Sequence, residues 1–231
     1  MIILFSDIIS KAINLFDDPD IRWLYANDPA GCMQFMRPYV LTAKDLFSYP
    51  TAIADRLSVY TSDEGKTEEI DGENTDTYVL STTPTADAVF SYKIGKEFVQ
   101  GTYDRSTNSV TFSREIADNE TCTVTWYYAG AFTGNFDNMF RSDFPVAPII
   151  EKIKNILVYG TLSAWGENEK NRALEIRNLF SDSDLGFYSP ASSAKAKVDW
   201  HNQMNRDMDT LVVELSWRFM STPQGGSRFG K

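Results

Sequence analysis

Apolar residues recur at steps of three and four positions in the first part of the chain, and this spacing predicts helices. The first helix is expected to end at the turn signal of residues 17–20. A second apolar series covers residues 32–47, with a break or kink expected at Pro38, and a short third helix is expected near Pro50. Residues 1–58 are therefore predicted to be mainly helical.

The pattern changes in the middle of the chain. Residues 61–76 (TSDEGKTEEIDGENTD) contain seven acids and one large apolar residue, Ile70, a composition that cannot bury enough surface to pack. We expect a hydrated linker there. Beyond it, apolar and polar positions alternate, as in CTVTWY at 122–127, and turn-forming residues separate the alternating runs. Five short antiparallel strands are expected between about Thr77 and Ala129.

Helical spacing returns in the last third of the chain. Helices are expected over about 145–162, with Pro145 in the first turn, over about 168–180 and over about 191–220. At about 1.5 Å per residue, the last of these would be a rod of about 45 Å. The sequence therefore predicts an α+β protein, in which a helical bundle core is interrupted by an inserted small antiparallel β-sandwich or barrel-like domain.

Four segments follow from this division. They are the first half of the helical domain, the acidic linker with the inserted β-domain, the second half of the helical domain with the long final helix, and a flexible C-terminal arm, at residues 1–60, 61–135, 136–220 and 221–231. The arm contains two adjacent glycines, one proline, one aromatic ring, two positive charges and no acid. Such a segment is expected to become ordered when another surface supplies its partners.

Charge and composition narrow the function classes. The net charge of −10 over 231 residues argues against a free-standing nucleic-acid binder, because phosphate binding relies on clustered Lys and Arg. The apolar runs are too short to cross a bilayer, and the first residues lack the positive region of an export signal. Cys32 and Cys122 fall in different predicted domains, which favours a reducing compartment over a disulfide.

Few residues suggest catalysis. The one histidine, His201, lies on or next to the apolar stripe of the final helix, which favours a structural or interface role. Ser192 and Lys195 have the S-x-x-K spacing, but a serine at a helix start is more typical of a cap. The acids of residues 63–76 lack the ligand spacing of a calcium loop. The aromatic run at 126–128 could stack on a sugar, although its alternation favours core filling. We therefore expect no enzyme, no metal and no cofactor.

Three helical segments and the strand-rich region together carry a resemblance. The helical segments are PIIEKIKNILVYGTLSAW at 148–165, NRALEIRNLF at 171–180 and the long helix at 196–219. Their order resembles that of the head-to-tail connector (adaptor or neck) family of tailed bacteriophages. Residues 78–130 resemble the small β-domains of structural proteins from those phages. Compact members of the connector family are helices alone, so the insertion departs from the family pattern.

The resemblance implies a structural protein of the virion. It would form a homo-oligomeric ring, commonly dodecameric, that binds the portal protein on one side and the downstream neck or tail protein on the other, with passive contact to DNA in the channel and no membrane. It would be located in the virion neck, and in the host cytoplasm during assembly. The alternative is a carbohydrate- or receptor-binding virion module carried by the β-domain.

In such proteins the final helix and C-terminal tail commonly reach into the portal. An aromatic ring could fill a pocket there, the basic side chains could meet acids, and the paired glycines would allow a bend. The expected portal-binding residues are Arg218, Gln224, Gly225, Gly226, Arg228, Phe229 and Lys231.

Overall fold

The computed structural model describes residues 1–15, 18–61, 65–136, 146–179 and 190–220. Only the backbone is described at Pro19 and at residues 167–179, 190–198 and 216–220. The helices are α1 Phe5–Leu15, α2 Pro19–Asn27, α3 Pro29–Leu46, α4 Thr51–Ala54, α5 Ala147–Leu179 and α6 Pro190–Met220. The strands are β1 Ile2–Leu4, β2 Leu57–Tyr60, β3 Gly65–Asp71, β4 Thr75–Val79, β5 Val89–Ile94, β6 Glu97–Val99, β7 Gly101–Asp104, β8 Ser109–Ile116, β9 Thr121–Tyr127 and β10 Ala131–Gly134.

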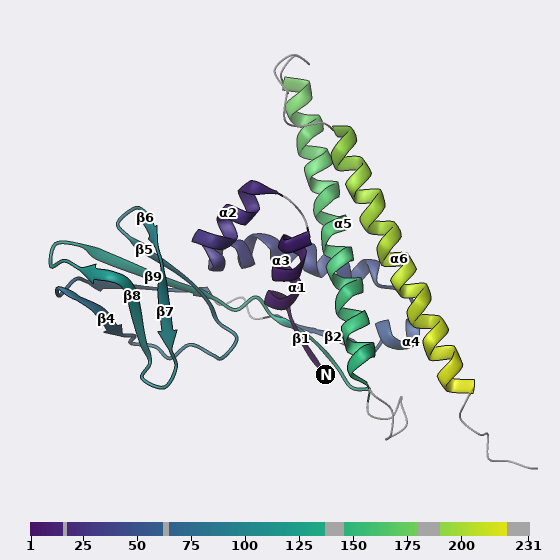
Figure 1. Cartoon of the computed structure of the whole chain (residues 1–231), viewed down its shortest axis with the longest axis horizontal. Coiled ribbons are helices and arrows are strands. Elements are labelled where there is room, and N and C mark those ends of the chain that lie inside the picture. The colour runs from purple at the N-terminus through teal and green to yellow at the C-terminus, as the bar shows by residue number, and fades with distance from the viewer. Residues whose placement is uncertain (16–17, 62–64, 137–145, 180–189, 221–231) are drawn as a thin grey trace, which may run out of the picture.

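The strands form three antiparallel sheets. Sheet A has the order β1-β10-β2, sheet B the order β3-β9-β5-β6 and sheet C the order β4-β8-β7. Side chains from sheets B and C meet in one hydrophobic cluster, the sandwich core, which includes Val110 and Phe112 from sheet C and Val124 and Trp126 from sheet B. Figure 1 shows sheets B and C at one end of the molecule, projecting away from the long helices.

A second and larger cluster, the main core, joins the helices to sheet A. Ile3 and Phe132 bring the inner face of sheet A into this core, and the rings of Phe132 and Phe5 lie 4.8 Å apart. Helices α5 and α6 lie side by side (Figure 1) and α5 also packs on α3. At Gly160 the approach is so close that a Cβ atom would lie 2.9 Å from the Cβ atom of Ala43.

The fold class predicted from the sequence is wrong. The described residues contain three antiparallel sheets beside six helices, rather than a helical bundle core with one inserted β-domain. The difference arises at sheet A, because β1 precedes the first helix and β2 lies in a region predicted to be helical. Both strands pair with β10, which is more than 70 residues away from either of them in the sequence. Strands of three or four residues are too short for periodicity to reveal such pairing.

Two local predictions need correction, and one helix was not predicted. Residues 65–71 of the expected acidic linker form β3, which pairs along its whole length with β9. The first helix was expected to end at residues 17–20, and α1 ends at Leu15, but the helix that follows was not predicted. Asp18 begins this helix, α2, since its carboxylate accepts hydrogen bonds from the N–H groups of Asp20 and Ile21. The two helices expected over about 145–162 and 168–180 form one helix, α5.

Candidate interaction surfaces

In the described part of the chain, the residues singled out as candidates for chemistry are not brought together in one site. Among the described residues, no group of three or more His, Cys, Asp or Glu side chains could hold a metal ion, and no helix is long and apolar enough to cross a membrane. His201 is half-buried on α6, next to Trp200, whose ring stacks on that of Tyr159 at 5.7 Å. The side chains of Ser192 and Lys195 lie outside the described part of the chain.

The two cysteines are free and buried. Cys32 belongs to the main core and Cys122 to the sandwich core. Burial raises the pKa of each thiol to about 12, and the charge of Asp28 adds to the effect at Cys32. Both thiols therefore stay protonated at neutral pH and are poor nucleophiles.

The aromatic run at 126–128 fills cores, as its alternation predicted. Trp126 and Tyr128 belong to the sandwich core, and Tyr127, on the opposite face of β9, belongs to the main core. Trp126 is 1% exposed, Tyr127 is 5% exposed and Tyr128 is 7% exposed. A sugar-stacking face built from these three rings is therefore excluded.

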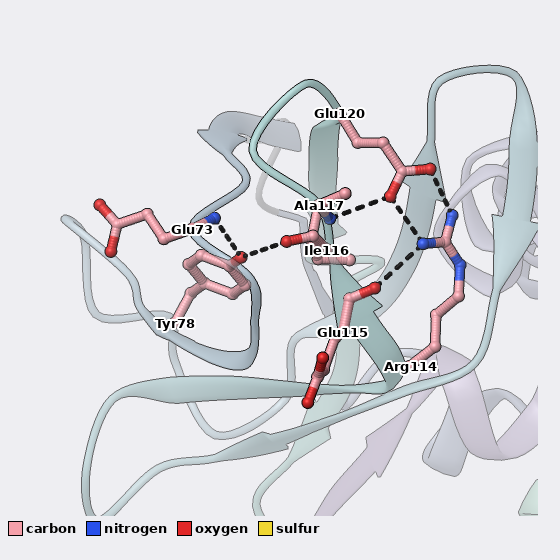
Figure 2. Close-up of polar contacts among 7 residues, drawn as sticks. All are labelled: Glu73, Tyr78, Arg114, Glu115, Ile116, Ala117 and Glu120. Atoms are coloured by element: carbon pink, nitrogen blue, oxygen red, sulfur yellow. Dashed lines mark hydrogen bonds and ion pairs between the residues drawn. The ribbon is translucent and has the colours of Figure 1, made fainter.

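The end of the sandwich that carries the β3–β4 loop and the β8–β9 turn is held by a network of hydrogen bonds, the distal clasp (Figure 2). Tyr78 Oη accepts a hydrogen bond from the N–H of Glu73, and the N–H of Gly72 donates to the C=O of Glu120. A Cβ atom at Gly72 would lie 1.9 Å from the C=O oxygen of Ala117, so this position requires glycine.

An ion pair completes the distal clasp. Arg114 donates to both carboxylate oxygens of Glu120, at 2.6 and 2.8 Å, and Glu120 also accepts from the N–H of Ala117 (Figure 2). These contacts lower the pKa of Glu120 from its ordinary value of 4.5 to about 2, with the Arg114 side chain as the main cause. Arg114 is exposed and Glu120 is half-buried, and their contacts fix the β8–β9 turn.

The sandwich joins the helices at α3. Arg37 Nη1 donates to Tyr127 Oη at 3.0 Å, and the N–H of Ala30 donates to the buried Ser91 Oγ at 2.8 Å. A cavity of about 350 Å³ lies beside these contacts, and its lining includes the side chains of Gln34 and Lys93. Polar contacts and a cavity therefore lie at this junction, beside the apolar packing of Tyr127 and Val89 against the main core.

Sheet A presents exposed apolar side chains. Paired residues in an antiparallel sheet share a face, so Ile2, Thr133 and Ser58 form one row of the outer face, and Leu4, Ala131 and Tyr60 form the next. Ile2 is 70% exposed and Tyr60 is 63% exposed, at opposite edges of this face. A shallow hollow of about 510 Å³ lies over the first row. Exposed apolar side chains that lie beside a hollow are typical of an interaction surface.

The portal-binding residues predicted from the sequence cannot be placed in this structure. Residues 221–231 lie outside its described part, and so does the side chain of Arg218 on α6. The predicted set of Arg218, Gln224, Gly225, Gly226, Arg228, Phe229 and Lys231 therefore stays a prediction.

Sequence reasoning missed the outer face of sheet A. Two uncharged runs, MIIL at 1–4 and LSVY at 57–60, were the available signals.

Comparisons of this chain with protein-family models, curated proteins and solved structures found no match.

Proposed function

We propose that this protein is a structural component of a tailed-phage virion. In this proposal it is a head-to-tail connector that forms a ring between the portal and the next neck or tail component. It acts without catalysis, in the virion neck after assembly in the host cytoplasm, and DNA passes through the ring.

The observation that carries the proposal is the pair of exposed apolar side chains, Ile2 and Tyr60, on the outer face of sheet A. Apolar side chains exposed on a sheet with open edges are characteristic of a subunit that binds other chains, because they favour aggregation when left uncovered. The order of helices along the chain, with its resemblance to connector proteins, adds the kind of assembly. The net charge of −10 supports this proposal, because an acidic channel wall repels the DNA phosphates and lets DNA pass through without binding.

The experiment is to image the assembled particle and the purified protein by electron microscopy. We expect a ring at the neck of the particle, with density for this chain between the portal and the tail. A particle in which this chain is absent or lies elsewhere would overturn the proposal.

The arm is tested separately by deleting Thr222–Lys231. We expect the truncated protein to keep its circular dichroism spectrum and melting temperature and to lose attachment to the portal protein of the same virus. A single change of Phe229 to alanine should weaken attachment less than the deletion. Unchanged attachment of the truncated protein would overturn the role of the arm and leave the ring untouched.

A second candidate is recognition of a carbohydrate or receptor by the β-domain. Two features favour it. The cavity beside α3 is lined by Lys93, whose ammonium group lies 4.3 Å from the ring centroid of Phe98. The exposed ring of Trp23 also contacts Phe98, with the two ring centroids 5.8 Å apart. Aromatic rings beside polar groups suit sugar binding. Glycan-array binding that Trp23→Ala abolishes and Val79→Ala preserves is expected if this function holds, and an array without binding would count against it.

A further inference from the structure

Two residues of β1 have backbone N–H and C=O groups that point away from sheet A. Met1 and Gly134 are joined by two hydrogen bonds, and the N–H of Phe5 donates to the C=O of Gly130. Bonding alternates along an antiparallel pair, so Ile3 also faces β10. The N–H and C=O groups of Ile2 and Leu4 therefore point outward, along the free edge of β1.

The backbone of β2 does the same on the opposite edge. Because Gly134, Phe132 and Gly130 bond towards β1, the alternate residues of β10 bond towards β2, Thr133 with Ser58 and Ala131 with Tyr60. Leu57 and Val59 therefore direct their N–H and C=O groups away from β10. Within the described residues, β1 and β2 pair with β10 alone.

Within the described residues, neither of these edge strands carries a charged side chain, a proline or a bulge. Natural edge strands are commonly protected by charged side chains, proline or bulges. The strands Ile2–Leu4 and Leu57–Tyr60 contain none of these, since their sequences are IIL and LSVY and their registers with β10 are regular. Each edge also places one exposed apolar side chain on the outer face, Ile2 on β1 and Tyr60 on β2.

We propose that the β2 edge of one copy pairs with the β1 edge of a second copy, so that sheet A continues from subunit to subunit. Strands β1 and β2 are both antiparallel to β10, so they run in the same direction and the new pair is parallel. In a parallel pair one residue bonds to the two neighbours of the residue opposite it. Val59 then lies opposite Ile3 of the second copy, its N–H donates to the C=O of Ile2, and its C=O accepts from the N–H of Leu4.

This register keeps the two faces of the sheet in order. Val59 and Ile3 both point to the inner face, and Tyr60 comes to lie beside Leu4 of the second copy on the outer face. Ser58 comes to lie beside the second copy's Ile2. The exposed apolar side chains at both edges are thereby covered by a single kind of contact.

A second copy fits these edges better than other occupants. A contact of β2 with β2 about a two-fold axis, or a strand from another protein added to β2, leaves Ile2 and the β1 edge uncovered. A head-to-tail contact uses both edges in every subunit, and it generates a closed ring when the rotation closes. The inference rests on the proposed ring and names the surfaces through which that ring forms.

Disulfide trapping tests the register. Ile2 and Ser58 of one copy flank Thr133 on neighbouring strands, so they are two strand spacings, about 9.6 Å, apart and cannot be bridged within one chain. The native thiols are buried and stay protonated. Under mild oxidation the double variant Ile2→Cys/Ser58→Cys is expected to give a ladder of covalent multimers on a non-reducing gel, while each single variant stays a monomer.

Two results of the trapping experiment overturn the proposal. One is a double variant that gives no ladder although the wild-type protein forms rings under the same conditions. The other is a Val59→Cys variant that alone gives a disulfide dimer, because that product requires a two-fold β2-to-β2 contact.

Charge substitution tests whether the edges drive assembly. Tyr60→Lys is expected to weaken self-association about tenfold or more, measured by analytical ultracentrifugation. The matched control is Val79→Lys, on an edge strand of sheet C with a side chain that is 71% exposed, and it should associate like the wild type. A mixture of Ile2→Lys and Tyr60→Lys proteins should form dimers, since each protein keeps the edge that the other lacks.

The outcomes separate this inference from the proposed function. Rings that persist unchanged in Tyr60→Lys would overturn pairing through sheet A and leave the connector proposal standing. A wild-type protein that is monomeric at every concentration and absent from the particle would overturn both.

Discussion

The edges of sheet A and the edges of sheets B and C carry different side chains. On sheet B, the edge strand β3 (GKTEEID) contains four charged residues and the edge strand β6 contains Glu97. On sheet C, the edge strands β4 and β7 contain Asp76 and Asp104. The edge strands of sheet A contain no charge.

This difference shows what the acids of residues 65–76 do. As part of a linker they would only keep a connection hydrated, but in β3 and β4 they protect exposed edges against pairing with other chains. Among the described strands, four edge strands thus carry charged residues and the two edge strands of sheet A carry none. Such a pattern is expected when one sheet is used for contact and the others must stay unpaired.

The largest expected effect is the loss of stability when one phenylalanine is removed from each of the two cores. Phe132→Ala in the main core and Phe112→Ala in the sandwich core remove the same side chain from the central strands β10 and β8, where the residues are 0% and 3% exposed. Each should lower the free energy of unfolding by about 3–5 kcal/mol, through lost burial and the cavity left behind. Urea denaturation measures this loss.

The two variants should differ in where protection is lost. By hydrogen exchange, Phe112→Ala should lower protection in sheets B and C and leave self-association intact. Phe132→Ala should lower protection in sheet A and α1 and weaken association as well. Equal loss of protection throughout the chain in both variants would show one cooperative unit and contradict the division into two.

A smaller effect is expected at the junction of the two cores. Tyr127→Phe removes the acceptor of the hydrogen bond from Arg37, which should cost about 0.5–1.5 kcal/mol. The matched control is Tyr128→Phe, whose hydroxyl accepts from the N–H of Thr85 within the β-sheet region. Unfolding monitored separately in each core should show the two transitions moving apart in Tyr127→Phe. In Tyr128→Phe the sandwich transition alone should move, and an identical response of both variants would argue against a role for this bond in coupling.

Periodicity predicted the helices α3 and α6 and the inner strand β9, but it did not predict sheet A. Helices α3 and α6 follow apolar series with many repeats, and β9 alternates over seven residues, so the signals were strong. Strands β1 and β2 are three and four residues long and depend on a partner far away in the sequence. Such pairing is a property of the tertiary structure and leaves no local pattern.

Two other errors have a chemical cause. Aspartate followed by proline both ends and begins helices, and at Asp18 its carboxylate caps α2. The strand β3 contains four charged residues and one large apolar residue because none of its side chains is buried, and this makes its composition resemble that of a linker. For the proposed interface, the uncharged residues of β1 and β2 were visible in the sequence, but their position at sheet edges was not.

The smallest expected effect concerns the distal clasp, which lies on sheets B and C, the sheets whose edge strands carry charge. The pKa of Glu120 is about 2 in the folded protein, below its ordinary value of 4.5, so its contribution to stability is fully present above about pH 4.5 and is lost as the pH falls towards 2. Glu120→Gln should therefore be less stable than the wild type at pH 7, and the difference should shrink as the pH falls through this window. Urea denaturation of the sandwich at a series of pH values measures this change.

Glu115→Gln is the matched control, because it removes a nearby carboxylate but keeps the backbone C=O to which Arg114 donates and leaves the Arg114–Glu120 pair intact. A difference between Glu120→Gln and the wild type that stays constant from pH 7 to pH 2 would show that the ion pair does not stabilise the clasp. Self-association should be the same in both variants, because the clasp is built on sheets B and C and not on the open edges of sheet A.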